Sequence, residues 1–337
     1  MAKINRTDYI ASYFLNTKKI YQTKLANNII TLQFFQRKDN VVLAGMSEVL
    51  ALLEAETDTS KYKIKYLPDG SIINQKEVVL ELEGNWTEFG IWEGMIDGIL
   101  NRYSSIATNA RNCVEAAKNK QVIFMGDRAD HYLNQEVDGK AVALGGITLT
   151  STIAQQKQQL NNLNQKPFAS MPHALIQGFD GDTVAATQAY SELFPNHNII
   201  ALVDYHNDVI GESLKVYNAL KDKVWGVRID TSANMVDRMF DNQEPHYGVN
   251  PTQIKNLRKA LDNAGATNYK IIVSSGITAD KITEFEAQNT PVDYYGVGQS
   301  ILNININFSA DATMLNGKKQ AKEGRCYTFN EKLVEYN

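Results

Sequence analysis

The sequence is poor in cysteine and has no long hydrophobic run, and each shortage excludes a class of protein. Two cysteines in 337 residues cannot form a disulfide framework or a four-cysteine zinc site, so we expect a protein of the reducing cytosol. No apolar run approaches the roughly 18 residues that span a membrane. The first ten residues are polar and mixed in charge, unlike a signal peptide, so we expect a cytoplasmic chain without a membrane partner.

Basic residues are not in excess either. Lys and Arg number 34 against 38 Asp and Glu, which gives a formal net charge of −4 and argues against a nucleic-acid partner. The hydrophobic share of 43% suffices for a large core and excludes wholesale disorder. At roughly 150 residues per domain, the length predicts about two domains.

The pattern of apolar and polar residues changes near residue 120. Before it, short strand-like segments precede a helical stretch over 86–118, whose apolar residues recur at the helical period. After it, short apolar runs recur, each followed by a polar or Gly-rich step, with helical stretches between several of them. The expected strands are Val122–Met125, Ala141–Leu144, Ile199–Val203, Val224–Ile229, Ile271–Val273 and Val292–Tyr295; the expected helices include Glu212–Leu220, Gln253–Ala264 and Ala279–Ala287.

Apolar runs without alternation, separated by helices, are typical of a parallel sheet covered on both faces. Six to eight such units close into an α/β barrel, or stay open as a doubly wound sheet. We place an α+β N-terminal domain at residues 1–110 and the barrel at 111–300. The polar, strand-like segment 301–337 is expected to return to the first domain.

In such folds the functional site lies at the carboxyl ends of the strands. Asp204 and Asp230 follow two expected strands, where carboxylates can hold ribose hydroxyls or a metal ion, or stabilise a developing cation. The alternative is a salt bridge that fixes a loop, since Arg228 lies on the same side of the strand as Asp230. Arg128 and His131 follow another strand, and the Arg fork suits a carboxylate or a phosphate.

Two Gly-rich turns follow the last two expected strands. Backbone N–H groups in the turns around Gly276 and Gly296–Gly298 can bind a phosphate at a helix start, although tight packing explains glycines equally well. His173 lies in a loop before a helix. A lone histidine there is more often a structural, hydrogen-bonded residue than a catalytic one.

The ordered motifs resemble those of nicotinate phosphoribosyltransferases, closest to the compact branch of that family. They are Ser170-Met171-Pro172-His173-Ala174-Leu175, Val227-Arg228-Ile229-Asp230-Thr231, Ile272-Val273-Ser274-Ser275-Gly276 and Tyr294-Tyr295-Gly296-Val297-Gly298, with Gly126-x-Arg128-x-x-His131 and Tyr13-Phe14 with Thr17 upstream. The resemblance covers residues 10 to 325. Among the departures, Ala129 replaces the second arginine of an Arg-Arg pair, and Ser275 replaces a glycine.

The resemblance implies the irregular α/β barrel of type II phosphoribosyltransferases, with an α+β N-terminal domain completed by the C-terminal tail. It implies transfer of a phosphoribosyl group from 5-phosphoribosyl-1-pyrophosphate to nicotinate in NAD salvage, with Mg²⁺, and with ATP hydrolysed through a phosphorylated His173. Asp230 would hold the ribose, Asp204 is a possible Mg²⁺ ligand, and no zinc is expected. Tyr13 would stack on nicotinate from the partner subunit of a homodimer with shared sites.

The residues assigned to the site fall into three groups. The catalytic group is His173, Asp204 and Asp230; the substrate-binding group is Tyr13, Arg128, His131, Thr148, Ser170, Arg228 and Thr231; the phosphate-binding group is Ser274, Ser275, Gly276, Gly296, Gly298 and Gln299.

Three alternatives stay open. Nicotinamide or quinolinate could be the acceptor, although one pocket arginine suits a single carboxylate better than two or none. A non-catalytic protein that binds phosphoribosyl ligands is the second. An aldolase-like barrel is the third, but it needs a reactive Lys at a strand end, and none of the strand-end steps contains one.

Overall fold

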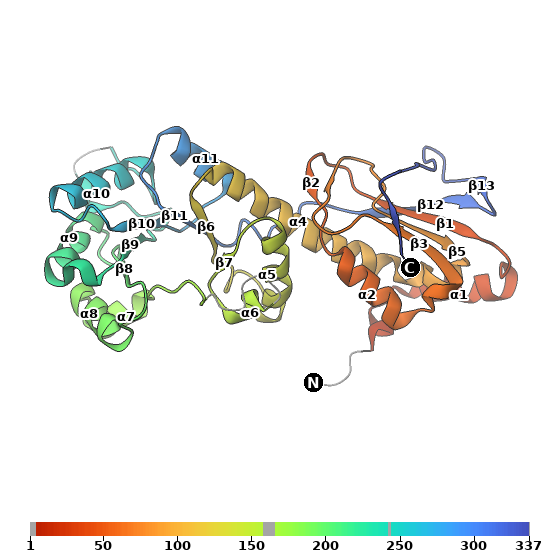
Figure 1. Cartoon of the computed structure of the whole chain (residues 1–337), viewed down its shortest axis with the longest axis horizontal. Coiled ribbons are helices and arrows are strands. Elements are labelled where there is room, and N and C mark those ends of the chain that lie inside the picture. Colours follow the sequence, from red (N-terminus) through yellow and green to blue (C-terminus); the bar gives the residue numbers. More distant parts are fainter. Residues whose placement is uncertain (1–4, 158–165, 242–243, 337) are drawn as a thin grey trace. The chain divides into compact units, whose positions relative to one another are not determined.

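A computed structural model describes residues 5–157, 166–241 and 244–336 (Figure 1). The chain forms two compact units. Unit 1 contains the described residues up to Thr108 together with those from Asn303 onward, and unit 2 spans Asn109–Leu302. Each unit has its own sheet. No helix in the described part of the chain is long and apolar enough to cross a membrane.

Unit 1 is built on an antiparallel sheet of six strands in the order β13-β12-β1-β5-β3-β14. The strands from the first part of the chain are β1 (Ile30–Phe35), β3 (Tyr62–Tyr66) and β5 (Leu80–Gly84), and those from the tail are β12 (Ser309–Leu315), β13 (Lys318–Lys319) and β14 (Val334–Glu335). A separate pair joins β2 (Val41–Val42) to β4 (Ile72–Ile73); the helices are α1 (Ser12–Lys24), α2 (Met46–Glu56), α3 (Trp86–Phe89) and α4 (Glu93–Ala117).

The core of unit 1 follows from alternation along the strands. Leu32 and Phe34 of β1 are buried against Ile96 and Leu100 of α4 in one apolar cluster. Burying one such side chain contributes about 1.5–3 kcal/mol. Helix α4 and the shorter α3 lie in the stretch 86–118 for which the sequence predicts helix, and this prediction is confirmed.

Unit 2 is built on a parallel sheet in the order β7-β6-β11-β10-β9-β8. Its strands are β6 (Gln121–Phe124), β7 (Leu149–Thr150), β8 (Ile200–Leu202), β9 (Gly226–Ile229), β10 (Lys270–Val273) and β11 (Tyr294–Val297). Its helices after α4 are α5 (Gln135–Leu144), α6 (Ile153–Gln156), α7 (His173–Gly178), α8 (Thr183–Leu193), α9 (Val209–Leu220), α10 (Pro251–Asn263) and α11 (Ala279–Ala287). Helices α9 and α10 lie outside the strands β8–β10 (Figure 1).

The expected strand at Ala141–Leu144 is wrong, because these residues form the last turn of α5. Ala has the highest helix propensity, and Gly145 follows the run as the helix cap, so this short apolar run ends a helix. The strand of this unit comes five residues later, as β7 at Leu149–Thr150. Its two residues are too few to show a pattern in the sequence.

As far as the structure describes the chain, the parallel sheet of unit 2 is open at both edges. Within the described residues, β7 and β8 form the two edges of the parallel sheet, and no hydrogen-bonded pairing closes it into a ring. Both edge strands are short, at two and three residues, and so offer few backbone groups for pairing.

Candidate active site

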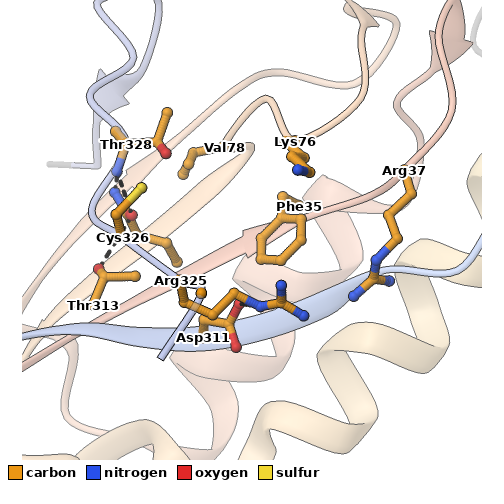
Figure 2. Close-up of a pocket in the computed structure, with 11 residues that line it drawn as sticks. Phe35, Arg37, Lys76, Val78, Asp311, Thr313, Arg325, Cys326 and Thr328 are labelled. Carbon is orange, nitrogen blue, oxygen red and sulfur yellow. Dashed lines mark hydrogen bonds and ion pairs between the residues drawn. The ribbon is translucent and has the colours of Figure 1, made fainter. Parts of the chain in front are cut away.

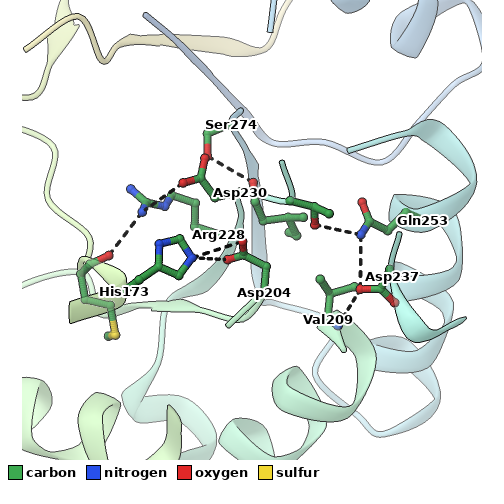
Figure 3. A network of polar contacts seen from close by, with 11 residues as sticks. His173, Asp204, Val209, Arg228, Asp230, Asp237, Gln253 and Ser274 are labelled. Atoms are coloured by element: carbon green, nitrogen blue, oxygen red, sulfur yellow. Dashed lines mark hydrogen bonds and ion pairs between the residues drawn. The ribbon is translucent and has the colours of Figure 1, made fainter. Parts of the chain in front are cut away.

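Polar side chains collect where β8, β9 and β10 end. Asp204 lies just after β8, Asp230 follows β9 directly, and Ser274 follows β10 directly. Because these strands are parallel neighbours, their carboxyl ends share one edge of the sheet. Figure 3 shows these side chains together with His173 and Arg228.

His173 and Asp204 form a pair at this edge. The imidazole Nε2 lies 3.3 Å from both carboxylate oxygens of Asp204. The two differ in exposure, since 45% of the His173 side chain is accessible but only 6% of the Asp204 side chain. Burial raises the pKa of Asp204, while His173 opposes the rise and Asp230 adds to it. The carboxylate can therefore fix one ring nitrogen while the rest of the imidazole faces solvent.

Arg228 connects this pair to the neighbouring strand. Its Nη2 donates to the carbonyl oxygen of Met171 at 3.3 Å and lies 4.0 Å from Asp230 Oδ2. Burial lowers the pKa of the guanidinium, and the carboxylates of Asp230 and Asp204 oppose that effect. Its Nε is buried and has no hydrogen-bond partner. Arg228 thus joins the loop before His173 to β9 and keeps one unused donor.

Asp230 is held by Ser274. The Ser274 hydroxyl lies 2.7 Å from Asp230 Oδ1 and 3.2 Å from the carbonyl oxygen of Ile229. Ser274 is 4% exposed, so this contact is shielded from water. Ser274, which was predicted to bind a phosphate, thus contacts one oxygen of the Asp230 carboxylate. The other oxygen, Oδ2, faces Arg228.

The turn after β10 has an unusual backbone. Ser275 and Gly276 adopt left-handed conformations, with φ of 69° and 64°. Such a φ is uncommon for a residue other than glycine, asparagine or aspartate, so Ser275 is strained. A Cβ added at Gly276 would meet nothing within 4 Å, so open space lies over the turn. That space is where a bound group could approach the backbone.

The expected turn begins later than predicted, because Gly296 lies within β11 and pairs with Ile123, while Gly298 follows the strand; both glycines have a packing role. A Cβ at Gly296 would lie 2.6 Å from Met125 Sδ, and one at Gly298 would lie 2.7 Å from the Met125 carbonyl oxygen. The Met125 N–H also donates to the carbonyl oxygen of Val297 at 2.8 Å. These contacts favour tight packing as the reason for both glycines. Gln299, which follows, is exposed.

The predicted residues after β6 lie in a more open region. Arg128 and His131 are exposed, and His131 Nδ1 accepts from the Leu133 N–H at 3.4 Å as an N-cap. The charge of Arg128 contributes to the lowered pKa of Arg228, which places Arg128 within electrostatic range of that buried guanidinium. Two cations near one another are suited to an anionic ligand.

The remaining predicted residues are dispersed. Thr148 is exposed just before β7, and the Ser170 hydroxyl is buried without a hydrogen-bond partner. Thr231 is 1% exposed and accepts from Gln253 Nε2 at 3.2 Å. Tyr13 lies on α1 in unit 1 with 62% of its surface exposed. The buried polar residues Gln253 and Asp237 were not predicted from the sequence, because no local sequence pattern marks a contact between a loop residue and a residue of the following helix.

The described residues include carboxylates that could bind a metal ion only as a pair. None of them form a group of three or more His, Cys, Asp or Glu side chains that could hold an ion. Asp204 and Asp230 are close enough for one carboxylate to raise the pKa of the other. Such a pair fits Mg²⁺, which is commonly held by one or two carboxylates together with substrate phosphates.

Unit 1 contains a separate cavity of about 110 Å³, which the sequence did not indicate (Figure 2). Arg37, Lys76 and Arg325 contribute cations to its lining, beside the ring of Phe35. Arg325 Nε pairs with Asp311 Oδ2 at 2.8 Å. Arg37 Nη1 donates to the Ser309 hydroxyl at 3.1 Å. Both guanidiniums thus have partners from β12.

Comparison with known proteins gives two kinds of similarity. A family model described as the N-terminal domain of quinolinate phosphoribosyl transferase matches residues 12–104. Nicotinate phosphoribosyltransferases of Mycobacterium tuberculosis and Bacillus subtilis are 27% and 26% identical to the chain, each over 70% of it. The matched regions are 47% and 45% of those enzymes, so the chain spans about half the length of these relatives.

Solved structures share the fold along nearly the whole chain. A nicotinate-nucleotide pyrophosphorylase from Pyrococcus furiosus has a TM-score of 0.83 and 29% identity, covering 97% of this chain and 81% of that one. The human nicotinic acid phosphoribosyltransferase has a TM-score of 0.70 and 16% identity, covering 92% and 75%. The chain thus has the type II phosphoribosyltransferase fold, with nicotinate phosphoribosyltransferases among its homologues.

Proposed function

We propose that this homologue of nicotinate phosphoribosyltransferases transfers the 5-phosphoribosyl group from 5-phosphoribosyl-1-pyrophosphate to nicotinate in NAD salvage. The products are nicotinate mononucleotide and pyrophosphate. The observation that carries the proposal is the pair of His173 and Asp204, with Asp230 and Arg228 on the neighbouring strand end. This arrangement places carboxylates, a guanidinium and an accessible imidazole at the edge where ligands of α/β folds bind.

Asp230 stabilises the reacting sugar in this mechanism. The nicotinate ring nitrogen bonds to C1 of the ribose while the bond from C1 to the pyrophosphate oxygen breaks, so positive charge develops on the ring. A carboxylate with its position already fixed stabilises that charge without reorganisation. The Ser274 hydroxyl holds Oδ1. Oδ2 remains available to accept from a ribose hydroxyl.

Arg228 and Arg128 supply positive charge for the anionic groups of the substrates, and the unpartnered Arg228 Nε is a free donor for one of them. Mg²⁺, when bound, neutralises the pyrophosphate, and Asp204 and Asp230 would hold it. The turn at Ser275 and Gly276 offers its open face to the 5′-phosphate. Tyr13 would complete the site from the partner subunit of a cytoplasmic homodimer.

His173 couples the reaction to ATP in this proposal. In the tautomer with its proton on Nε2, the imidazole donates to Asp204 and keeps a lone pair on Nδ1. Nδ1 then bonds to the γ-phosphorus of ATP as the bond to the ADP oxygen breaks, and water later cleaves the N–P bond. Asp204 orients the ring and stabilises the positive charge that it acquires.

The test is formation of mononucleotide from the ribose donor, Mg²⁺ and one base at a time, with and without ATP. We expect product from nicotinate and stimulation by ATP. Because the matched family model is named for quinolinate phosphoribosyl transferase, quinolinate is a necessary arm beside nicotinamide. Product from either of these bases alone would overturn the choice of acceptor, and binding without turnover would favour a ligand-binding protein.

The His173→Ala variant tests the coupling. It is expected to lose the stimulation by ATP, because His173 is the imidazole that contacts the Asp204 carboxylate and is 45% accessible. Residual transfer without ATP should persist. His197, which is half-buried and stacks on Phe194 away from Asp204, serves as the control when substituted in the same way. Full stimulation by ATP in His173→Ala would exclude the phosphohistidine.

A further inference from the structure

Two buried polar residues, Asp237 and Gln253, lie beside the strand-end cluster without belonging to it (Figure 3). They are 1% and 0% exposed. Asp237 accepts from two backbone N–H groups, that of Val209 at Oδ2 and that of Met239 at Oδ1, each at 3.0 Å. Val209 is the first residue of α9, so Asp237 fastens the loop after β9 to the start of that helix.

Gln253 extends this connection toward Asp230. Its Nε2 lies 3.4 Å from Asp237 Oδ2 and 3.2 Å from the Thr231 hydroxyl. Thr231 directly follows Asp230. Gln253 itself is fixed near the start of α10, where its backbone N–H donates to the Asn250 side chain at 2.9 Å. A single amide group thus joins α10, the loop at Asp237 and the residue after Asp230.

We propose that Gln253 is a positioning residue, which holds the Asp230 carboxylate in place through Thr231; the inference rests on the proposed phosphoribosyl transfer. Asp230 is then fixed from two directions. Ser274 holds its carboxylate, and Gln253 holds the backbone on its carboxyl side through the Thr231 hydroxyl. Small displacements of a group that positions a substrate have large effects on its use, so the second contact matters even though Gln253 touches no ligand.

The contact is specific to the Thr231 hydroxyl. A valine at 231 keeps the branched shape and removes the acceptor, whereas a serine keeps the acceptor. A methionine at 253 has similar length but no donor. If Gln253 acts on Asp230 only through Thr231, the effect of its loss must vanish once the hydroxyl is absent.

The experiment measures kcat and KM of the full-length protein for 5-phosphoribosyl-1-pyrophosphate. Gln253→Met, Thr231→Val and the double variant should each raise this KM about tenfold, with the KM for nicotinate changed less than twofold. Thr231→Ser keeps the hydroxyl and should show a much smaller rise than Thr231→Val. Gln188→Met replaces an exposed glutamine on α8 and is the matched control.

Two outcomes would overturn the inference. One is a double variant whose KM is raised by the product of the two single effects. The other is a lowered melting temperature in Gln253→Met with both KM values unchanged, which describes a purely structural residue. Calorimetric binding of the ribose donor to the wild type and to Gln253→Met separates this question from the proposed function. A wild type that binds the donor but forms no mononucleotide refutes the transfer reaction, and a tenfold weaker binding in the variant still supports the positioning role.

Discussion

The cavity of unit 1 and the strand-end cluster of unit 2 both gather charged side chains, but they hold them differently. In the cavity, 41% of the Arg325 side chain is exposed, and its partner Asp311 is 21% exposed. In the cluster, Asp204 is 6% exposed and Arg228 is 17% exposed. The cavity is bounded by cations that water already solvates. The cluster holds its charges away from water.

This difference in side-chain exposure distinguishes a concave surface from a site suited to catalysis. Exposed ion pairs are screened and contribute about 0–1 kcal/mol. Buried charges shift the pKa of their neighbours and are costly to retain without a use: the Asp230 carboxylate adds to the raised pKa of Asp204, and both carboxylates oppose the lowered pKa of Arg228. The parallel sheet makes the cluster possible, because neighbouring strands deliver their following residues to the same edge. The antiparallel sheet of unit 1 has no such common edge.

The largest expected effect is at Asp230. Asp230→Asn removes the negative charge but keeps the shape, and we expect kcat/KM for mononucleotide formation to fall by about 10²- to 10³-fold. Asp262→Asn is the control, since Asp262 pairs with Arg258 on the exposed side of α10 and is 48% exposed. Equal activities of the two variants would remove the distinction between buried and exposed charge on which the comparison depends.

A smaller effect is expected at Asp97, a half-buried residue of unit 1 whose carboxylate Oδ1 is buried and has no hydrogen bond. Burial raises its pKa to about 7, and Arg37 opposes the rise. Because the folded state holds this proton more tightly than the unfolded state, the stability of unit 1 should fall as pH rises from about 4 to 7. Asp97→Asn should remove part of this fall, a difference on the order of 2 kcal/mol at pH 8.

Urea unfolding at pH 5 and pH 8 measures this difference. Trp86 and Trp92 belong to unit 1, and Trp225 belongs to unit 2. In a Trp225→Phe background, tryptophan fluorescence therefore reports the unfolding of unit 1. Identical pH dependence with and without Asp97 would show that the folded state does not hold its proton, and Asp97 would then differ from Asp204, whose pKa burial raises.

The smallest effect is expected in the cavity. Arg325→Met removes an ion pair with Asp311 that is partly exposed, so unit 1 should lose less than about 1 kcal/mol of stability. Mononucleotide formation should change less than twofold. Lys76→Met, on the opposite wall, is measured beside it. A tenfold loss of kcat/KM in either variant would mean that the cavity takes part in the reaction, and the comparison would have to be reversed.

Much of the fold was accessible from the sequence, because short apolar runs and helical periods are local signals. The strands after Asn198 and the helices α9 to α11 lie where these signals predicted them. The run Ala141–Leu144 was misassigned, since four apolar residues are compatible with a strand or a helix end. The two-residue β7 is defined by its pairing with β6, which no local pattern specifies.

The candidate site divides in the same way. Asp204, Asp230 and Ser274 follow strands and could be predicted from position alone, although their roles are still predictions. The distance between His173 and Asp204 depends on how two loops fold, and the contact of Gln253 with Thr231 joins a helix to a loop. Such contacts are set by tertiary packing. Whether a glycine near a strand end faces open space or a packed neighbour also depends on tertiary structure, as Gly276 and Gly296 illustrate.

The position of β12 has a consequence for how the chain folds. Unit 2 is continuous in sequence, whereas β12 pairs with β1 across a separation of more than 270 residues. Before residues 309–315 leave the ribosome, that side of β1 has no strand to accept its backbone hydrogen bonds. An unpaired strand edge invites pairing with other chains. Domains generally fold as units in the order of synthesis. Although synthesis of unit 1 starts first, all strands of unit 2 are made before β12 completes the sheet of unit 1.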